Sequence, residues 1–114
     1  MRRVLAEYIA HFNDLRIDRS AMRRNVEVRG GVAMAEALSS ALMPHVSRGD
    51  AMKHVERLCR TVDLEGGSLR ETAIRDPEIT RWLPPAEIDR VLAPENFLGS
   101  AKVFVERVLT LWSV

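Results

Sequence analysis

Two consecutive serines, Ser39 and Ser40, lie just before Met43-Pro44 and are the first residues whose types could do chemistry. A serine could act as a catalytic base only if its oxygen lies within hydrogen-bond reach of the proton it takes. The surrounding segment is rich in alanine and has helical spacing. A serine inside a helix is usually solvated or bonded back to the carbonyl four residues earlier. We therefore interpret both serines as helix residues and predict no catalytic role.

The histidines and the one cysteine are the other candidates for acid-base, metal or nucleophilic chemistry. His11, His45 and His54 lack ligand spacing and fall in separate predicted elements. Cys59 occupies an apolar helical position and, as the single cysteine, cannot form an internal disulfide. Neither Gly-Gly pair has the spacing of a phosphate-binding loop. We predict no metal, no cofactor and no catalytic residue.

Charge and hydropathy exclude further classes of function. The 114 residues include 17 basic and 16 acidic side chains, so no overall field attracts nucleic acid or anionic lipid. Arginines are dense in the first third, but acidic residues are interleaved with them, which favours a solvated face of mixed charge. No segment has the roughly 18 apolar residues that a membrane-spanning helix needs. We expect a cytoplasmic protein with no nucleic-acid and no membrane partner.

The elements that would position these residues are helices. Apolar residues recur at steps of three and four, and no alternating strand pattern of useful length is present. The length suits one domain. Serine and aspartate caps, prolines and glycine pairs mark the boundaries. The fold class is all-α, and we expect helices over residues 2–15, 18–26, 32–46, 48–65, 69–75, 77–83, 85–92 and 101–112.

The first of these helices carries an apolar stripe that requires a cover. Its members recur at helical spacing and share one side: Val4, Leu5, Tyr8, Ile9 and Phe12. Exposed apolar patches commonly mark association surfaces. We therefore predict that these five residues form a candidate association surface.

A series of motifs after residue 18 carries a family resemblance. "GGVAMAEAL", "SRGDA", "LRE", "DPEI", "LPPAEIDRVLAPENFLGSA" and "FVERVL" follow one another along the chain. In this order they resemble the C-terminal domain of the fumarase/aspartase superfamily, in its adenylosuccinate lyase and 3-carboxy-cis,cis-muconate cycloisomerase branch. "APENFLGSAKVFVERVL" is most similar to the cycloisomerase type. The resemblance implies a compact domain of about five to seven helices, several short, over residues 18–114, preceded by the tail of a longer bundle helix over residues 1–17.

The resemblance also implies what chemistry to expect. Such enzymes are tetrameric lyases that remove a proton next to a carboxylate, with the base on a loop of the form Gly-Ser-Ser-x-Met-Pro-x-Lys-x-Asn-Pro and the acid on an earlier histidine segment. Here Ala41 and Leu42 both intervene between the serines and the methionine, and the lysine and Asn-Pro are absent. These 114 residues contain neither segment, so we expect the chain to be inactive alone.

Three functions remain open. The first is the C-terminal helical domain of a 3-carboxy-cis,cis-muconate cycloisomerase-like lyase, and the second is the same domain of an adenylosuccinate lyase. The third is a stand-alone helical interaction module. The expected partner is either the remainder of a lyase or a second copy bound through the first helix, and we expect a homo-oligomer.

Overall fold

The computed structural model describes residues 2–112 and contains only helices and their connections in that range. The predicted all-α class is confirmed. Seven α-helices, α2 to α8, follow Asp18, and several have fewer than ten residues. The elements are α1 (Arg2–Asn13), α2 (Arg19–Glu27), η1 (Val28–Met34), α3 (Ala35–Leu42), α4 (Arg48–Glu65), α5 (Leu69–Arg75), α6 (Pro77–Thr80), α7 (Pro85–Leu92), η2 (Pro94–Asn96) and α8 (Ala101–Trp112).

Local capping explains where several helices begin. The side chains of Asp18, Ser47 and Ser68 each accept a hydrogen bond from the backbone amide three residues later, which satisfies a free amide of the first turn. The Asp76 side chain accepts hydrogen bonds from the amides of Glu78 and Ile79 in α6. Pro85 occupies the first turn of α7, where its missing amide costs nothing. The predicted starts after residues 18, 47, 68 and 84 are confirmed.

The helix predicted over residues 32–46 is too long at both ends, because α3 runs only from Ala35 to Leu42. Arg29, Gly30 and Gly31 all have positive φ angles, of 57°, 65° and 78°, so the chain makes a left-handed turn before it enters α3. A Cβ atom at Gly30 would overlap the carbonyl oxygen of Gly67. The turn therefore packs backbone against backbone, and only glycine fits at residue 30.

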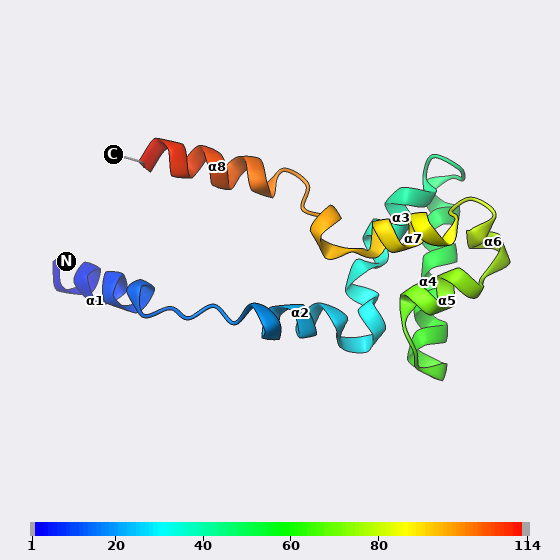
Figure 1. The fold of residues 1–114 in the computed structure, drawn as a ribbon, viewed down its shortest axis with the longest axis horizontal. Helices are drawn as coiled ribbons and strands as arrows, with labels where there is room; N and C mark the ends of the chain where they lie inside the picture. The colour runs from blue at the N-terminus through cyan, green and yellow to red at the C-terminus, as the bar shows by residue number, and fades with distance from the viewer. Residues whose placement is uncertain (1, 113–114) are drawn as a thin grey trace.

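The hydrophobic core lies between α3, α4, α5, α6 and α7. In Figure 1 these helices form the compact end of the molecule, with α3 and α7 lying across the long helix α4. The largest fully buried side chains are Leu38, Leu42, Leu58, Leu69, Ile79 and Ile88. Each of the five helices contributes at least one of them, so the core closes without α1, α2 or α8.

The remaining helices project from this core. Figure 1 shows α1 and α8 extending from the same side of the compact end, α1 through α2 and α8 through η2. The molecule measures 60 × 29 × 24 Å and its radius of gyration is 19.2 Å, whereas a compact chain of this length would have about 13 Å. Residues 3–13 of α1 are exposed, and α2 and α8 have no buried residue.

The expected division at residues 17 and 18 falls in the connection between α1 and α2. The ends of the two expected ranges, at residue 1 and residues 113–114, lie outside the described residues.

Candidate functional site

The predicted association surface lies on α1. Its five residues, at 4, 5, 8, 9 and 12, are between 53% and 73% exposed. Tyr8 and His11 also line a shallow depression on this helix. Within residues 2–112 no element buries the stripe, so this apolar surface is open to a partner.

A second apolar surface, which was not predicted as an association surface, lies on α8. Phe104, Val108 and Leu111 share one side of this helix and are 54% to 78% exposed. Lys102 and Glu106 occupy the other side and form an ion pair with 3.9 Å between Nζ and Oε1. The signal was present in the apolar spacing of residues 103–112, but that spacing is equally typical of a helix buried within its own domain.

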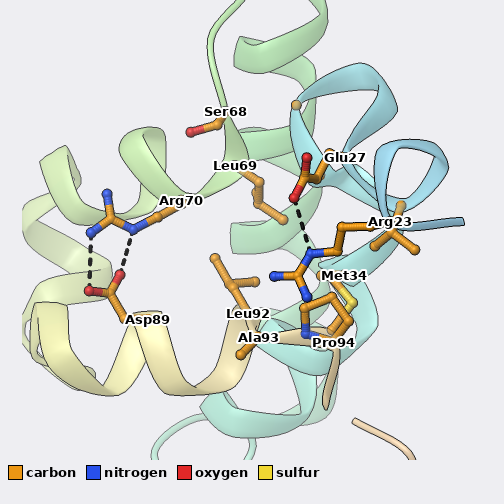
Figure 2. Close-up of a pocket in the computed structure, with 13 residues that line it drawn as sticks. Arg23, Glu27, Met34, Ser68, Leu69, Arg70, Asp89, Leu92, Ala93 and Pro94 are labelled. Atoms are coloured by element: carbon orange, nitrogen blue, oxygen red, sulfur yellow. Dashed lines mark hydrogen bonds and ion pairs between the residues drawn. The ribbon is translucent and has the colours of Figure 1, made fainter. Parts of the chain in front are cut away.

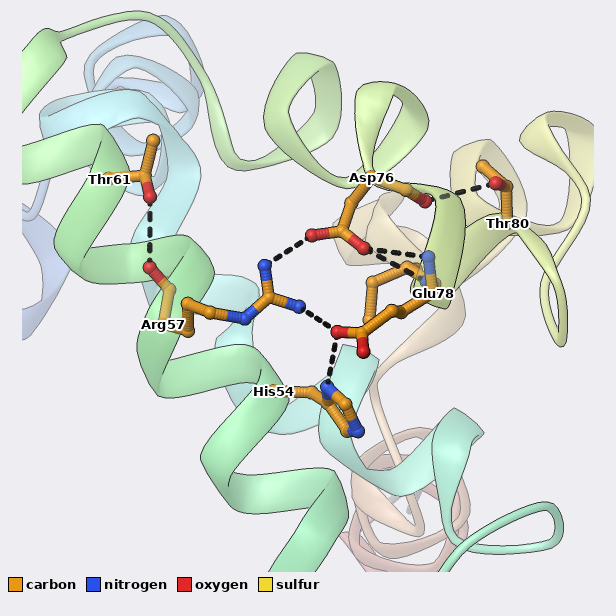
Figure 3. A network of polar contacts seen from close by, with 7 residues as sticks. His54, Arg57, Thr61, Asp76, Glu78 and Thr80 are labelled. Atoms are coloured by element: carbon orange, nitrogen blue, oxygen red, sulfur yellow. Dashed lines mark hydrogen bonds and ion pairs between the residues drawn. The ribbon is translucent and has the colours of Figure 1, made fainter.

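A network of charged groups ties α4 to α6 (Figure 3). The Arg57 guanidinium donates to an Asp76 carboxylate oxygen at 2.5 Å and to a Glu78 carboxylate oxygen at 2.7 Å. Nδ1 of His54 lies 3.5 Å from the same Glu78 oxygen. The His54 ring also packs edge-on against Trp82, with 5.5 Å between centroids. Each carboxylate of the network has a cationic partner, so the network fixes the helices together.

Asp76 is the most buried charged group of this network, with a side chain only 10% exposed. Burial favours the neutral acid, but the hydrogen bond from Arg57 and those from the amides of Ile79 and Glu78 together outweigh burial and lower the pKa of Asp76. The carboxylate is therefore held ionised as a helix cap, which is the opposite of what a proton donor at neutral pH requires.

A pocket of about 370 Å³ lies where η1, the start of α5 and the end of α7 meet (Figure 2). On one wall Arg70 forms two hydrogen bonds with Asp89, of 2.6 and 3.0 Å. On the other, Arg23 donates to Glu27 at 3.2 Å and also pairs with Glu95. Both arginines of the pocket are thus engaged by carboxylates. The pairing of Arg23 with Glu95 links α2 to η2, the bases of the two projecting helices.

The structure does not bring the other candidate residues together. His11 lies on α1, His45 in the turn after α3 and His54 on α4. Among residues 2–112 no group of three or more His, Cys, Asp or Glu side chains is placed to hold a metal ion. Cys59 is half-buried on α4, and burial raises the pKa of its thiol, which disfavours the nucleophilic thiolate.

The two serines lie within α3 as predicted. Ser39 is buried and Ser40 is exposed. No helix in the described part of the chain is both long and apolar enough to cross a lipid bilayer.

Comparisons with known proteins place this fold in a family. Residues 31–108 match the family described as "Adenylosuccinate lyase C-terminus". A 3-carboxy-cis,cis-muconate cycloisomerase from Pseudomonas aeruginosa is 34% identical over 105 residues, covering 92% of this chain and 23% of that protein. An adenylosuccinate lyase from Methanothermobacter thermautotrophicus is 34% identical over 89 residues, covering 77% of this chain and 20% of that protein.

A solved structure agrees with these relatives. The crystal structure of a 3-carboxy-cis,cis-muconate lactonizing enzyme from Pseudomonas putida superimposes with a TM-score of 0.76 at 33% identity, over 83% of this chain and 22% of that one. This chain thus spans about a fifth to a quarter of the length of the relatives that it matches. The chain belongs to the adenylosuccinate lyase C-terminus family and corresponds to the C-terminal helical domain of a cycloisomerase-like lyase.

Proposed function

We propose that this chain serves a cycloisomerase-like lyase as a helical packing domain and does not convert substrate by itself. The observation that carries the proposal is the superposition on the lactonizing enzyme, which accounts for 83% of this chain with 22% of that structure. An adenylosuccinate lyase is the alternative host. The cycloisomerase is favoured because its match is 34% identical over 92% of this chain, whereas an adenylosuccinate lyase from Archaeoglobus fulgidus that covers 93% of the chain is only 25% identical.

The apolar stripes of α1 and α8 supply the packing surfaces in this proposal. Burying one large apolar side chain contributes about 1.5–3 kcal/mol. Several such residues on each helix are together worth enough to offset the cost of ordering and association. We infer that the remainder of a lyase covers the stripe formed by Val4, Leu5, Tyr8, Ile9 and Phe12. Homo-oligomeric assembly and a cytoplasmic location are parts of the same proposal.

The chemistry of the described residues supports inactivity of the chain alone. Acid-base catalysis needs a base within hydrogen-bond reach of the proton that it takes. Asp76 and Glu78 are engaged by Arg57, Asp89 is engaged by Arg70, and Ser39 is buried within α3. We therefore expect no turnover of 3-carboxy-cis,cis-muconate or adenylosuccinate by the purified chain.

A hybrid enzyme tests this function. The matched C-terminal segment of the P. aeruginosa cycloisomerase is replaced by this chain, and 3-carboxy-cis,cis-muconate consumption is measured for the hybrid, the parent and the isolated chain. We expect the hybrid to be active and the isolated chain to be inactive. A hybrid that assembles like its parent and has no activity, or protein-dependent turnover by the isolated chain, contradicts the proposal.

Two variants of the hybrid test the packing surface. Phe12→Glu places a charge in the α1 stripe, and we expect it to reduce assembly and activity of the hybrid severalfold. Leu64→Glu is the matched control, because Leu64 is an 80% exposed leucine at the end of α4, outside both stripes. Equal effects of the two substitutions would show that the α1 stripe has no special role.

Self-association is the second candidate function, favoured by the exposure of the α1 stripe in the chain by itself. If the chain is a stand-alone module, sedimentation velocity of the isolated protein shows a dimer or larger species that Phe12→Glu dissociates and Leu64→Glu does not. A monomer at high protein concentration, with α1 helical by circular dichroism, excludes this candidate.

A further inference from the structure

A groove lies between α3 and α4, and the relationship to lyases assigns it no role. It has a volume of about 410 Å³, which lies within the range of small-molecule sites. Its apolar lining comes from Ala35 and Met43 on the α3 side and from Met52 and Val55 on α4. Cys59 also lines the groove. We call the surface lined by these residues and Ser39 the α3–α4 groove.

Ser39 is the polar residue that marks this groove as more than an apolar surface. It is the single buried polar residue in the described part of the chain, with 7% exposure. Its Oγ is fully buried and has no hydrogen-bond partner. A buried hydroxyl without a partner costs about 1–3 kcal/mol. Because this Oγ is closed to solvent, a ligand can accept a hydrogen bond from it only after the side chain rotates toward the groove, and that hydrogen bond would remove the cost.

The other lining residues define the chemistry of the ligand. Thioethers pack favourably against aromatic rings, and Met43 and Met52 are both partly exposed to the groove. The rim carries two acidic side chains, Glu36 and Glu56, and one basic side chain, Arg48. Because Glu56 is paired with Arg60, one charge of each sign remains, and the rim has no preference for an ion of either sign. The groove is therefore suited to a neutral aromatic molecule.

We propose that the α3–α4 groove binds a small, neutral aromatic molecule that carries one hydrogen-bond acceptor, with the Ser39 hydroxyl as donor. The methionine side chains hold the ring, and Ser39 selects for the acceptor. Such a site lies on the folded core and is independent of the apolar stripes of α1 and α8.

Cys59 provides a readout restricted to this groove, because it is the one thiol of the chain. The full chain is incubated with 2-acetylnaphthalene, and the rate of Cys59 alkylation by iodoacetamide is measured against probe concentration. The matched probe is 2-ethylnaphthalene, which has a similar shape and no acceptor. We expect saturable protection by 2-acetylnaphthalene and binding about fivefold weaker for 2-ethylnaphthalene.

Two serine variants identify the donor. Ser39→Ala should remove the preference for 2-acetylnaphthalene, whereas Ser40→Ala, a substitution of the exposed neighbouring serine in the same groove, should leave it intact. Because the Ser39 hydroxyl has no partner, Ser39→Ala should not lower the thermal unfolding midpoint of the chain. A lower midpoint would show that the hydroxyl is bonded within the protein and would overturn the proposal.

Two further results would also overturn it. One is the absence of protection, or equal protection by both probes that Ser39→Ala does not change. The other is protection of Cys59 without any probe that grows with protein concentration, since a second copy of the chain would then be the occupant of the groove.

Discussion

The folded core of α3 to α7 and the projecting helices α1 and α8 have similar apolar spacing and opposite exposure. Leu38, Leu58 and Ile88 in the core are at most 1% exposed, whereas Phe12 on α1 and Phe104 on α8 are 73% and 61% exposed. An amphipathic pattern therefore identifies the side of a helix that needs a cover. It does not identify whether the cover belongs to the same chain.

The largest expected effect separates these two regions directly. Leu58→Ala opens a cavity in the core and should lower the free energy of unfolding of the isolated chain by about 2–5 kcal/mol. Leu5→Ala on α1, where Leu5 is 62% exposed, should change it by less than about 0.5 kcal/mol. Urea unfolding followed by circular dichroism measures both. Similar losses for the two variants would mean that α1 is packed within the isolated chain.

The left-handed turn before α3 provides the next contrast. Gly30→Ala should lower the free energy of unfolding by more than about 2 kcal/mol, because it adds an overlap with Gly67 to a strained backbone. Gly31 also has a positive φ, but its Cβ would point into open space. Gly31→Ala should therefore cost only about 1 kcal/mol. Equal losses would indicate that backbone strain alone, and not the contact with Gly67, determines the requirement for glycine.

The charged network around Asp76 and Arg57 makes the free energy of unfolding depend on pH in the acid range. Because folding lowers the pKa of Asp76, the ionised carboxylate contributes stability above the ordinary aspartate pKa of about 3.9, and this contribution is lost as the pH falls through the lower folded value. Asp76→Asn keeps a capping side chain and removes the charge. We expect it to cost about 1 kcal/mol at pH 7 and to flatten the decline of the melting temperature below about pH 4. An unchanged pH profile would contradict this role of Asp76.

The smallest effect is expected for the surface pair of Arg70 and Asp89, whose side chains are 54% and 45% exposed. Exposed ion pairs contribute about 0.2–1 kcal/mol. Arg70→Ala should therefore lower the free energy of unfolding far less than Leu58→Ala does, and the loss should shrink further in 1 M salt. A loss as large as that of Leu58→Ala would mean that the pair supports the core and not only its surface.

The helix starts were predictable because their signals are local. The caps at Ser47 and Ser68 depend only on residues within one turn, so the sequence contains the whole interaction. The late start of α3 was not predictable in this way. It depends on the contact between Gly30 and Gly67, which are distant in the sequence and meet only in the folded core.

The candidate sites show the same limit. The five α1 residues were identified from spacing alone, and their exposure fits an association surface without identifying the partner. The α3–α4 groove could not be predicted, because it depends on the packing of two helices. Ser39 and Ser40 are adjacent in the sequence, and only the packing distinguishes the buried hydroxyl without a partner from the exposed one.

Hydrogen exchange tests the central claim most directly, which is that the core folds alone and that α1 and α8 need a partner. Amide protection is measured by mass spectrometry in the isolated chain at low concentration and in the hybrid cycloisomerase. We predict that α4 is protected in both proteins and that α1 and α8 become protected only in the hybrid. Strong protection of α1 and α8 in the isolated monomer, or rapid exchange of both helices in an active hybrid, would contradict the account.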